Sequence, residues 1–121
     1  MSDEEARSDL RTRTKQFALR VIKMCKKLPE NRAGRFMGDQ VFRSGTSAGA
    51  NYREAFCARS KAEFISKCGY SQKKLEETIY WFELLTESGT VPARRLTLLM
   101  KEADELMAIF SSSIKTSRNS R

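Results

Sequence analysis

The chain has 121 residues, of which 40% are hydrophobic, so it is long enough for one domain with a single buried core. Its formal net charge is +8 and it contains no histidine, a combination that points away from acid–base catalysis and toward an anionic partner. The apolar runs are far shorter than the roughly twenty residues that span a membrane, and the N-terminal residues are acidic and polar, so we expect a cytoplasmic protein with no membrane partner.

The first predicted helix covers residues 9–28 and ends at Pro29, because apolar residues recur there on one helical face. Residues 11–43 hold ten basic residues but only two acidic ones. Basic side chains of this helix lie on or beside a stripe opposite the apolar face, which indicates a surface for the phosphates of RNA or DNA. The alternative is a solvated face that only keeps the protein soluble. The candidate nucleic-acid-binding residues are Arg11, Arg13, Lys15, Arg20, Lys23, Lys26 and Lys27.

The second predicted helix begins after Gly38 and contains an unusual run of small residues at positions 44–51. Read by propensity, this run is a loop between two short helices. Read by size, it is a helix that can approach a neighbour closely, and the local sequence does not decide between the two. If the run is helical, four polar residues align on one ridge, which either seals tight helix packing or faces a ligand. The motif ridge consists of Arg43, Ser47, Asn51 and Glu54.

The third predicted helix has clear ends. Ser60 and Glu63 have the spacing of a capping box at its start, and the helix runs to about Glu87, where Gly89 suits the turn that follows. It is apolar on two sides, and the second side would face water in a lone bundle, so we expect it to contact another subunit. The alternative is that these side chains pack on a neighbouring helix of the same chain. The predicted oligomer-contact residues are Tyr70, Trp81 and Leu84.

The fourth predicted helix follows Pro92 and carries apolar residues at spacings of three and four as far as Ile114. Four amphipathic helices with short connections predict an all-α fold, an antiparallel up-down four-helix bundle. We expect a single domain over residues 1–121, with flexible tails at about residues 1–8 and 116–121.

The residue types for catalysis and metal binding are poorly represented. Without histidine, the common nucleophile–base pairs and the commonest metal ligand are missing. The three cysteines are widely spaced and read as reduced, packed thiols. The glycines at positions 45 and 49 lack the Gly-Lys-Ser/Thr ending of a phosphate-binding loop. We therefore expect no catalytic residues, no metal, no cofactor and no enzymatic activity.

Residues 38–55 contain the pattern Asp-Gln-x-x-Arg-x-x-x-Ser-x-x-x-Asn-x-x-Glu. This run resembles the signature of bacterial four-helix-bundle proteins encoded in intervening sequences of 23S ribosomal RNA genes, and residues 60–65 and 80–85 match the same family. The resemblance implies that the small-residue run is helical and that five copies form a ring. It also implies kinship with the accessory protein of diversity-generating retroelements, a basic barrel that associates with nucleic acid and a reverse transcriptase. Gly45 and Gly49 stand where many members have bulkier residues or proline.

Together these features predict a homo-oligomer that binds RNA or DNA through the basic first helix. No aromatic residue is interleaved with the basic ones, so we expect little base stacking and low sequence specificity. The alternative is a protein-interaction scaffold for an acidic or nucleic-acid-processing partner, such as a reverse transcriptase. Binding to nucleic acid that weakens steeply with salt would favour the first hypothesis.

Overall fold

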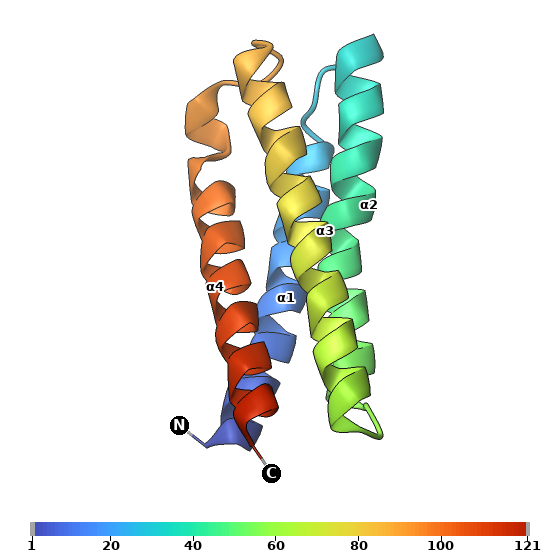
Figure 1. The fold of residues 1–121 in the computed structure, drawn as a ribbon. Coiled ribbons are helices and arrows are strands. Elements are labelled where there is room, and N and C mark those ends of the chain that lie inside the picture. The colour runs from blue at the N-terminus through green and yellow to red at the C-terminus, as the bar shows by residue number, and fades with distance from the viewer. Residues whose placement is uncertain (1, 121) are drawn as a thin grey trace.

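The computed structural model describes residues 2–120, the side chain of Asp3 excepted, and consists of four long helices. These are α1 (Asp3–Cys25), α2 (Arg32–Phe56), α3 (Lys61–Glu87) and α4 (Thr97–Asn119), with a short 3-10 helix, η1 (Ala93–Arg95), before the last. Successive helices run in opposite directions, and the two ends of the chain lie at the same end of the molecule (Figure 1). The predicted antiparallel four-helix bundle is confirmed.

Helix α1 begins earlier than the sequence predicts. Ser2 is its N-cap, and the Ser2 hydroxyl accepts a hydrogen bond from the Glu5 amide at 3.1 Å. Residues 3–8, expected to form a flexible tail, are helical, and α4 likewise extends to Asn119 through most of the other expected tail. At its other end α1 finishes at Cys25, four residues before Pro29.

Helix α2 also starts earlier than predicted, at Arg32, because Asn31 caps it and not a residue after Gly38. The Asn31 side-chain oxygen accepts a hydrogen bond from the Gly34 amide at 2.8 Å. The small-residue run 44–51 is one uninterrupted helix. Its glycines permit the close approach of α1: a Cβ at position 45 would lie 2.9 Å from both γ carbons of Val21.

Helix α3 has the predicted ends. Ser60 accepts a hydrogen bond from the Glu63 amide at 3.0 Å, and the Glu63 carboxylate accepts one from the Arg59 amide at 3.1 Å, one residue before the position that a standard capping box uses. Gly89 has φ of 76°, in the left-handed region that favours glycine. The chain then makes a turn through Pro92 and η1 before α4 starts at Thr97, so α4 lacks a first turn in line with its axis.

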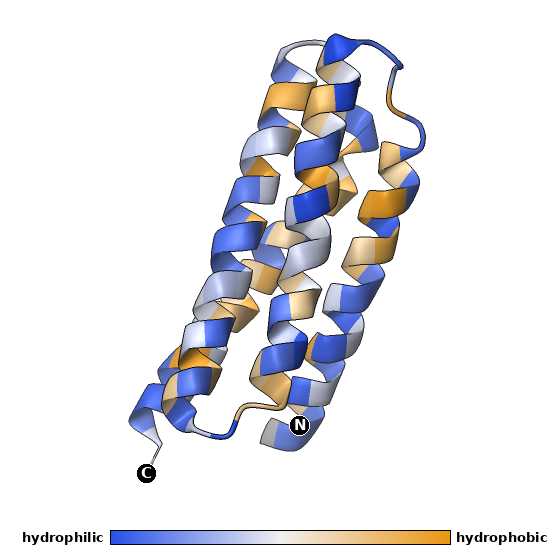
Figure 2. Ribbon diagram, turned by 90° about the vertical axis from the view of Figure 1, so that its right-hand side faces the viewer, coloured by the Kyte–Doolittle hydropathy of each residue, from blue (hydrophilic) through white to orange (hydrophobic). Residues whose placement is uncertain are grey.

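The core lies along the bundle axis, where the largest fully buried side chains are Tyr52, Phe17, Phe82 and Phe110. Hydrophobic and hydrophilic residues alternate along every helix, as amphipathic packing requires (Figure 2). Two buried hydroxyls join α2 to α3. Ser71 donates to the Ala48 carbonyl at 2.8 Å, and Thr78 donates to the Ser44 hydroxyl, also at 2.8 Å. No helix in the described part of the chain is long and apolar enough to cross a membrane.

Candidate nucleic-acid interface

Six of the seven basic residues predicted on the first helix are exposed on the outer side of α1 or in the turn that follows it. The segment 11–28 contains no acidic residue, and the acidic residues of α1 all precede it, at positions 3, 4, 5 and 9. Within residues 2–120, none of these six residues forms an ion pair. The exposed α1 cations, a name kept below, are Arg11, Lys15, Arg20, Lys23, Lys26 and Lys27.

Arg13, the seventh, is a correction to the prediction. Its guanidinium is half-buried and donates to both carboxylate oxygens of Glu102, Nη2 at 2.6 Å and Nε at 3.2 Å, and Nη2 also lies 3.4 Å from Glu105. The hydrogen bond to Glu102 raises the pKa of Arg13 above its ordinary value. Arg13 therefore fastens α1 to α4, and we leave it out of the candidate interface.

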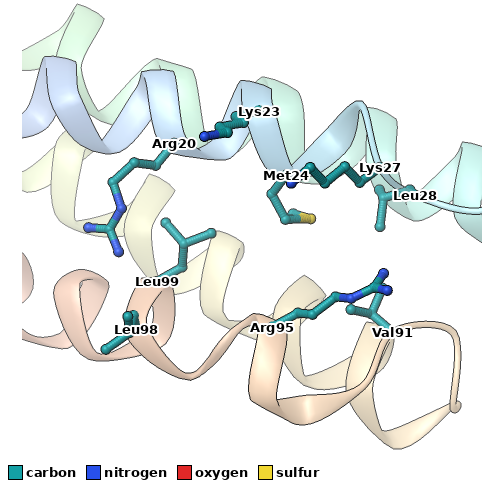
Figure 3. A pocket seen from close by; sticks show the side chains of 9 residues that line it. All are labelled: Arg20, Lys23, Met24, Lys27, Leu28, Val91, Arg95, Leu98 and Leu99. Carbon is teal, nitrogen blue, oxygen red and sulfur yellow. The ribbon is translucent and has the colours of Figure 1, made fainter.

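Two further arginines, from outside α1, extend the basic surface. Arg95 of η1 lies across a groove from Arg20, Lys23 and Lys27 (Figure 3). On the other side of α1, Arg53 of α2 lines a second groove, together with Arg11 and Lys15. Nothing in the sequence connects Arg95 with α1, because the two are brought together only when the helices pack. The sequence feature that could have drawn attention to Arg95 is the adjacent basic pair Arg94-Arg95.

The motif ridge lies on the side of α2 that faces away from the core. Its two middle residues, Ser47 and Asn51, form hydrogen bonds within α2. The Ser47 hydroxyl donates to the Arg43 carbonyl at 2.6 Å, and the Asn51 amide donates to the Ser47 carbonyl at 2.9 Å. Glu54 is 3.5 Å from the Lys67 ammonium of α3. The buried bonds between α2 and α3 come instead from Ser44 and from the Ala48 carbonyl. The ridge thus combines two hydrogen bonds within α2 with one ion pair to α3, and it lies beside the tight helix packing.

Two comparisons bear on this bundle. A family model described as the 23S rRNA-intervening sequence protein matches residues 7–112, which is most of the chain. The chain belongs to this family. A crystal structure of an S23 ribosomal protein family member of unknown function, from Bacteroides thetaiotaomicron, superposes with a TM-score of 0.85. It is 33% identical, and the match covers 91% of this chain and 98% of that one. No curated protein matches.

In this intervening-sequence protein, the predicted oligomer-contact residues lie on the α2–α3 side of the molecule. Trp81 is half-buried, its indole donates to Glu77 at 3.2 Å, and its ring meets Phe36 of α2 edge-on with centroids 5.9 Å apart. Leu84 is half-buried and Tyr70 is exposed. Sequence analysis missed Phe36 and Tyr80, which are 56% and 52% exposed and flank Trp81 on this surface.

Two of the three thiols of this intervening-sequence protein, Cys25 and Cys68, are held neutral by burial, whereas Cys57 is exposed and not packed as expected. Desolvation raises the pKa of Cys25 and of Cys68 to about 11 each, and the Cys25 thiol donates to the Gly38 carbonyl at 3.6 Å. Within residues 2–120, no three cysteine, aspartate or glutamate side chains gather where they could hold a metal ion.

Proposed function

We propose that this protein is a non-enzymatic, cytoplasmic homo-oligomer that binds RNA or DNA through the exposed α1 cations. The observation that carries the proposal is the concentration of unpaired positive charge on one side of one helix. Arg95 and Arg53 add charge on either flank of this surface. Phosphates are the anions that such a surface contacts most often, and each contact releases counterions from the nucleic acid.

Low sequence specificity follows from the side chains present. No aromatic ring lines either groove beside α1, so bases have no stacking platform there. In the described part of the chain, Phe56 is the ring that lies under one of these cations, the Arg11 guanidinium, at 5.1 Å from the ring centroid. Contacts from lysine and arginine to phosphates position a protein on the backbone but carry no sequence information.

Reversing two charges tests the interface. The double variant Arg20→Glu/Lys23→Glu is expected to bind a single-stranded RNA and an unrelated duplex DNA more weakly than the parent protein, to a similar extent for both. The log–log dependence of affinity on salt should flatten, because each lost phosphate contact removes about 0.7–0.9 from the slope. Fluorescence anisotropy over a range of salt concentrations measures both quantities.

The matched control is Lys73→Glu/Lys101→Glu, which makes the same charge change at exposed sites on α3 and α4. It should reduce binding much less. Both double variants should stay folded, since exposed substitutions usually change stability by less than about 0.5 kcal/mol. If Arg20→Glu/Lys23→Glu binds both nucleic acids as well as the parent at low salt, the exposed α1 cations are only a solvated face. The scaffold hypothesis, with an acidic or nucleic-acid-processing protein as partner, would then replace the proposal.

The homo-oligomer part of the proposal rests on the α2–α3 surface. Phe36 and Tyr80, each about half exposed, flank the half-buried Trp81 there, and the half-exposed Tyr70 lies about three turns earlier on α3. Large apolar side chains gathered on one side of a soluble protein are typical of a subunit contact. The number five comes from the family resemblance. A ring would repeat the exposed α1 cations on every copy, so that phosphate contacts multiply by avidity.

Light scattering tests this part. The parent protein is expected to have a mass well above 13.9 kDa at micromolar concentration. Trp81→Arg should lower that mass, because it places a charge in the proposed contact. Leu19→Arg, which changes an exposed leucine on α1, is the control and should leave the mass unchanged. A parent protein that is monomeric at micromolar concentration would contradict the proposal.

A further inference from the structure

The groove between α1 and the start of α4 has an apolar floor, and phosphate binding would leave this floor uncovered. It holds about 620 Å³ and lies where η1 and the turn before it, and not a further turn of α4, face the end of α1. Its floor is aliphatic and consists of Met24, Leu28, Val91 and Leu99. Leu98 stands at its edge and is 69% exposed (Figure 3).

Charge surrounds this floor on both sides. Arg20, Lys23 and Lys27 come from α1 and Arg95 comes from η1, and no acidic residue lines the groove. All four cations are exposed, and none forms an ion pair within the described part of the chain. An occupant must therefore offer an apolar surface in its middle and negative charge on both flanks.

We propose that this groove binds an acidic amphipathic helix of a partner protein. Aliphatic side chains spaced at i, i+3, i+4 and i+7 would lie on the floor, and flanking Asp or Glu residues would meet the four cations. The helical part of the α1 wall, from Arg20 to Cys25, runs for about 7.5 Å at 1.5 Å per residue, and the turn through Lys27 and Leu28 extends it.

Other occupants fit less well. Nucleobases prefer aromatic or arginine planes for stacking, and this floor is aliphatic. A small ligand is normally enclosed over most of its surface, whereas Leu98 projects into solvent at the edge of the groove. The contact proposed for a second copy of this chain lies on the α2–α3 surface, away from the residues that line this groove. Among these occupants, only an acidic amphipathic helix matches both the apolar floor and the four cations beside it.

A designed peptide tests the proposal on the full chain. The probe is an acidic helix of about 18 residues with leucines on one face and glutamates beside them. The control is a scrambled peptide of the same composition. Fluorescence anisotropy should show binding of the first peptide at least about tenfold tighter than that of the scrambled one, because only the first can bury its leucines together.

Leu98→Gln is the decisive variant, because it removes the apolar edge and leaves every charge in place. It should weaken peptide binding about tenfold, which is the effect of one leucine left unburied. It should leave RNA binding and the oligomer mass unchanged. Leu19→Gln is the matched control, since Leu19 is 57% exposed on α1 outside this groove, and it should not affect peptide binding.

Three results would overturn the inference. In the first, the two peptides would bind equally. In the second, Leu98→Gln would lower RNA affinity as much as peptide affinity, which would make the groove part of the nucleic-acid site. In the third, Leu98→Gln would lower the oligomer mass, which would place a second copy in the groove. Failure of the nucleic-acid proposal is a separate result, seen with RNA and DNA alone. If both proposals hold, the acidic peptide should compete with RNA, because Arg20, Lys23 and Lys27 belong to both surfaces.

Discussion

Replacing Phe82 or Leu75 with alanine is expected to lower the free energy of unfolding by about 2–5 kcal/mol. Both side chains are completely buried on α3, the helix that packs against α2 on one side and α4 on the other. Truncation would remove their contacts with both neighbours and leave a cavity, because long helices joined by short turns cannot close onto the space. Urea denaturation followed by circular dichroism measures the change, at one protein concentration because oligomer stability depends on it.

The matched control for Leu75→Ala is Leu98→Ala, the same chemical change at a leucine that is 69% exposed. It should cost less than about 0.5 kcal/mol. Losses below about 0.5 kcal/mol at both Phe82 and Leu75 would mean that the core side of α3 is wrongly assigned. A large loss for Leu98→Ala would instead mean that the groove beside η1 is filled in solution.

The fold class and the third helix could be predicted from the sequence because their signals are local. Hydrophobic spacing shows which side of a helix is buried. Ser60 marks one end of α3 by its capping hydroxyl, and Gly89 marks the other by its left-handed backbone. The start of α2 could not be read in this way. Gly38 looked like a boundary, yet it is buried inside the helix, where a Cβ would lie 2.8 Å from the Leu28 side chain. A glycine is needed at this position because of tertiary packing and not because a helix ends there.

The exposure of the basic side chains on the first helix could be predicted from the sequence, except at Arg13, for the same kind of reason. A helical wheel places Arg13 beside Arg20 and Lys23, and only the fold brings Glu102 to it, 89 residues later in the chain. The fold also adds Arg95, whose position depends on the turn after Pro92. Local sequence identified which helix is basic, whereas the packing of α4 decided which of its cations stay free.

The last feature to test is the close crossing of α1 and α2 at Gly45. Gly45→Ala is expected to lower the free energy of unfolding by about 1–3 kcal/mol, as overpacking does. The new methyl group would lie 2.9 Å from both γ carbons of Val21, a fully buried β-branched side chain with little freedom to rotate. Relief would require the two helices to move apart.

Gly69→Ala is the matched control, because Gly69 lies within α3 and a Cβ there would meet nothing within 4 Å. Alanine has a helix propensity about 1 kcal/mol better than that of glycine, so Gly69→Ala should raise the free energy of unfolding by about 0.5–1 kcal/mol. The two substitutions are chemically identical, and opposite signs in urea denaturation can come only from their surroundings. If Gly45→Ala also stabilises the protein, α1 and α2 do not pack as closely in solution as Val21 and Gly45 indicate.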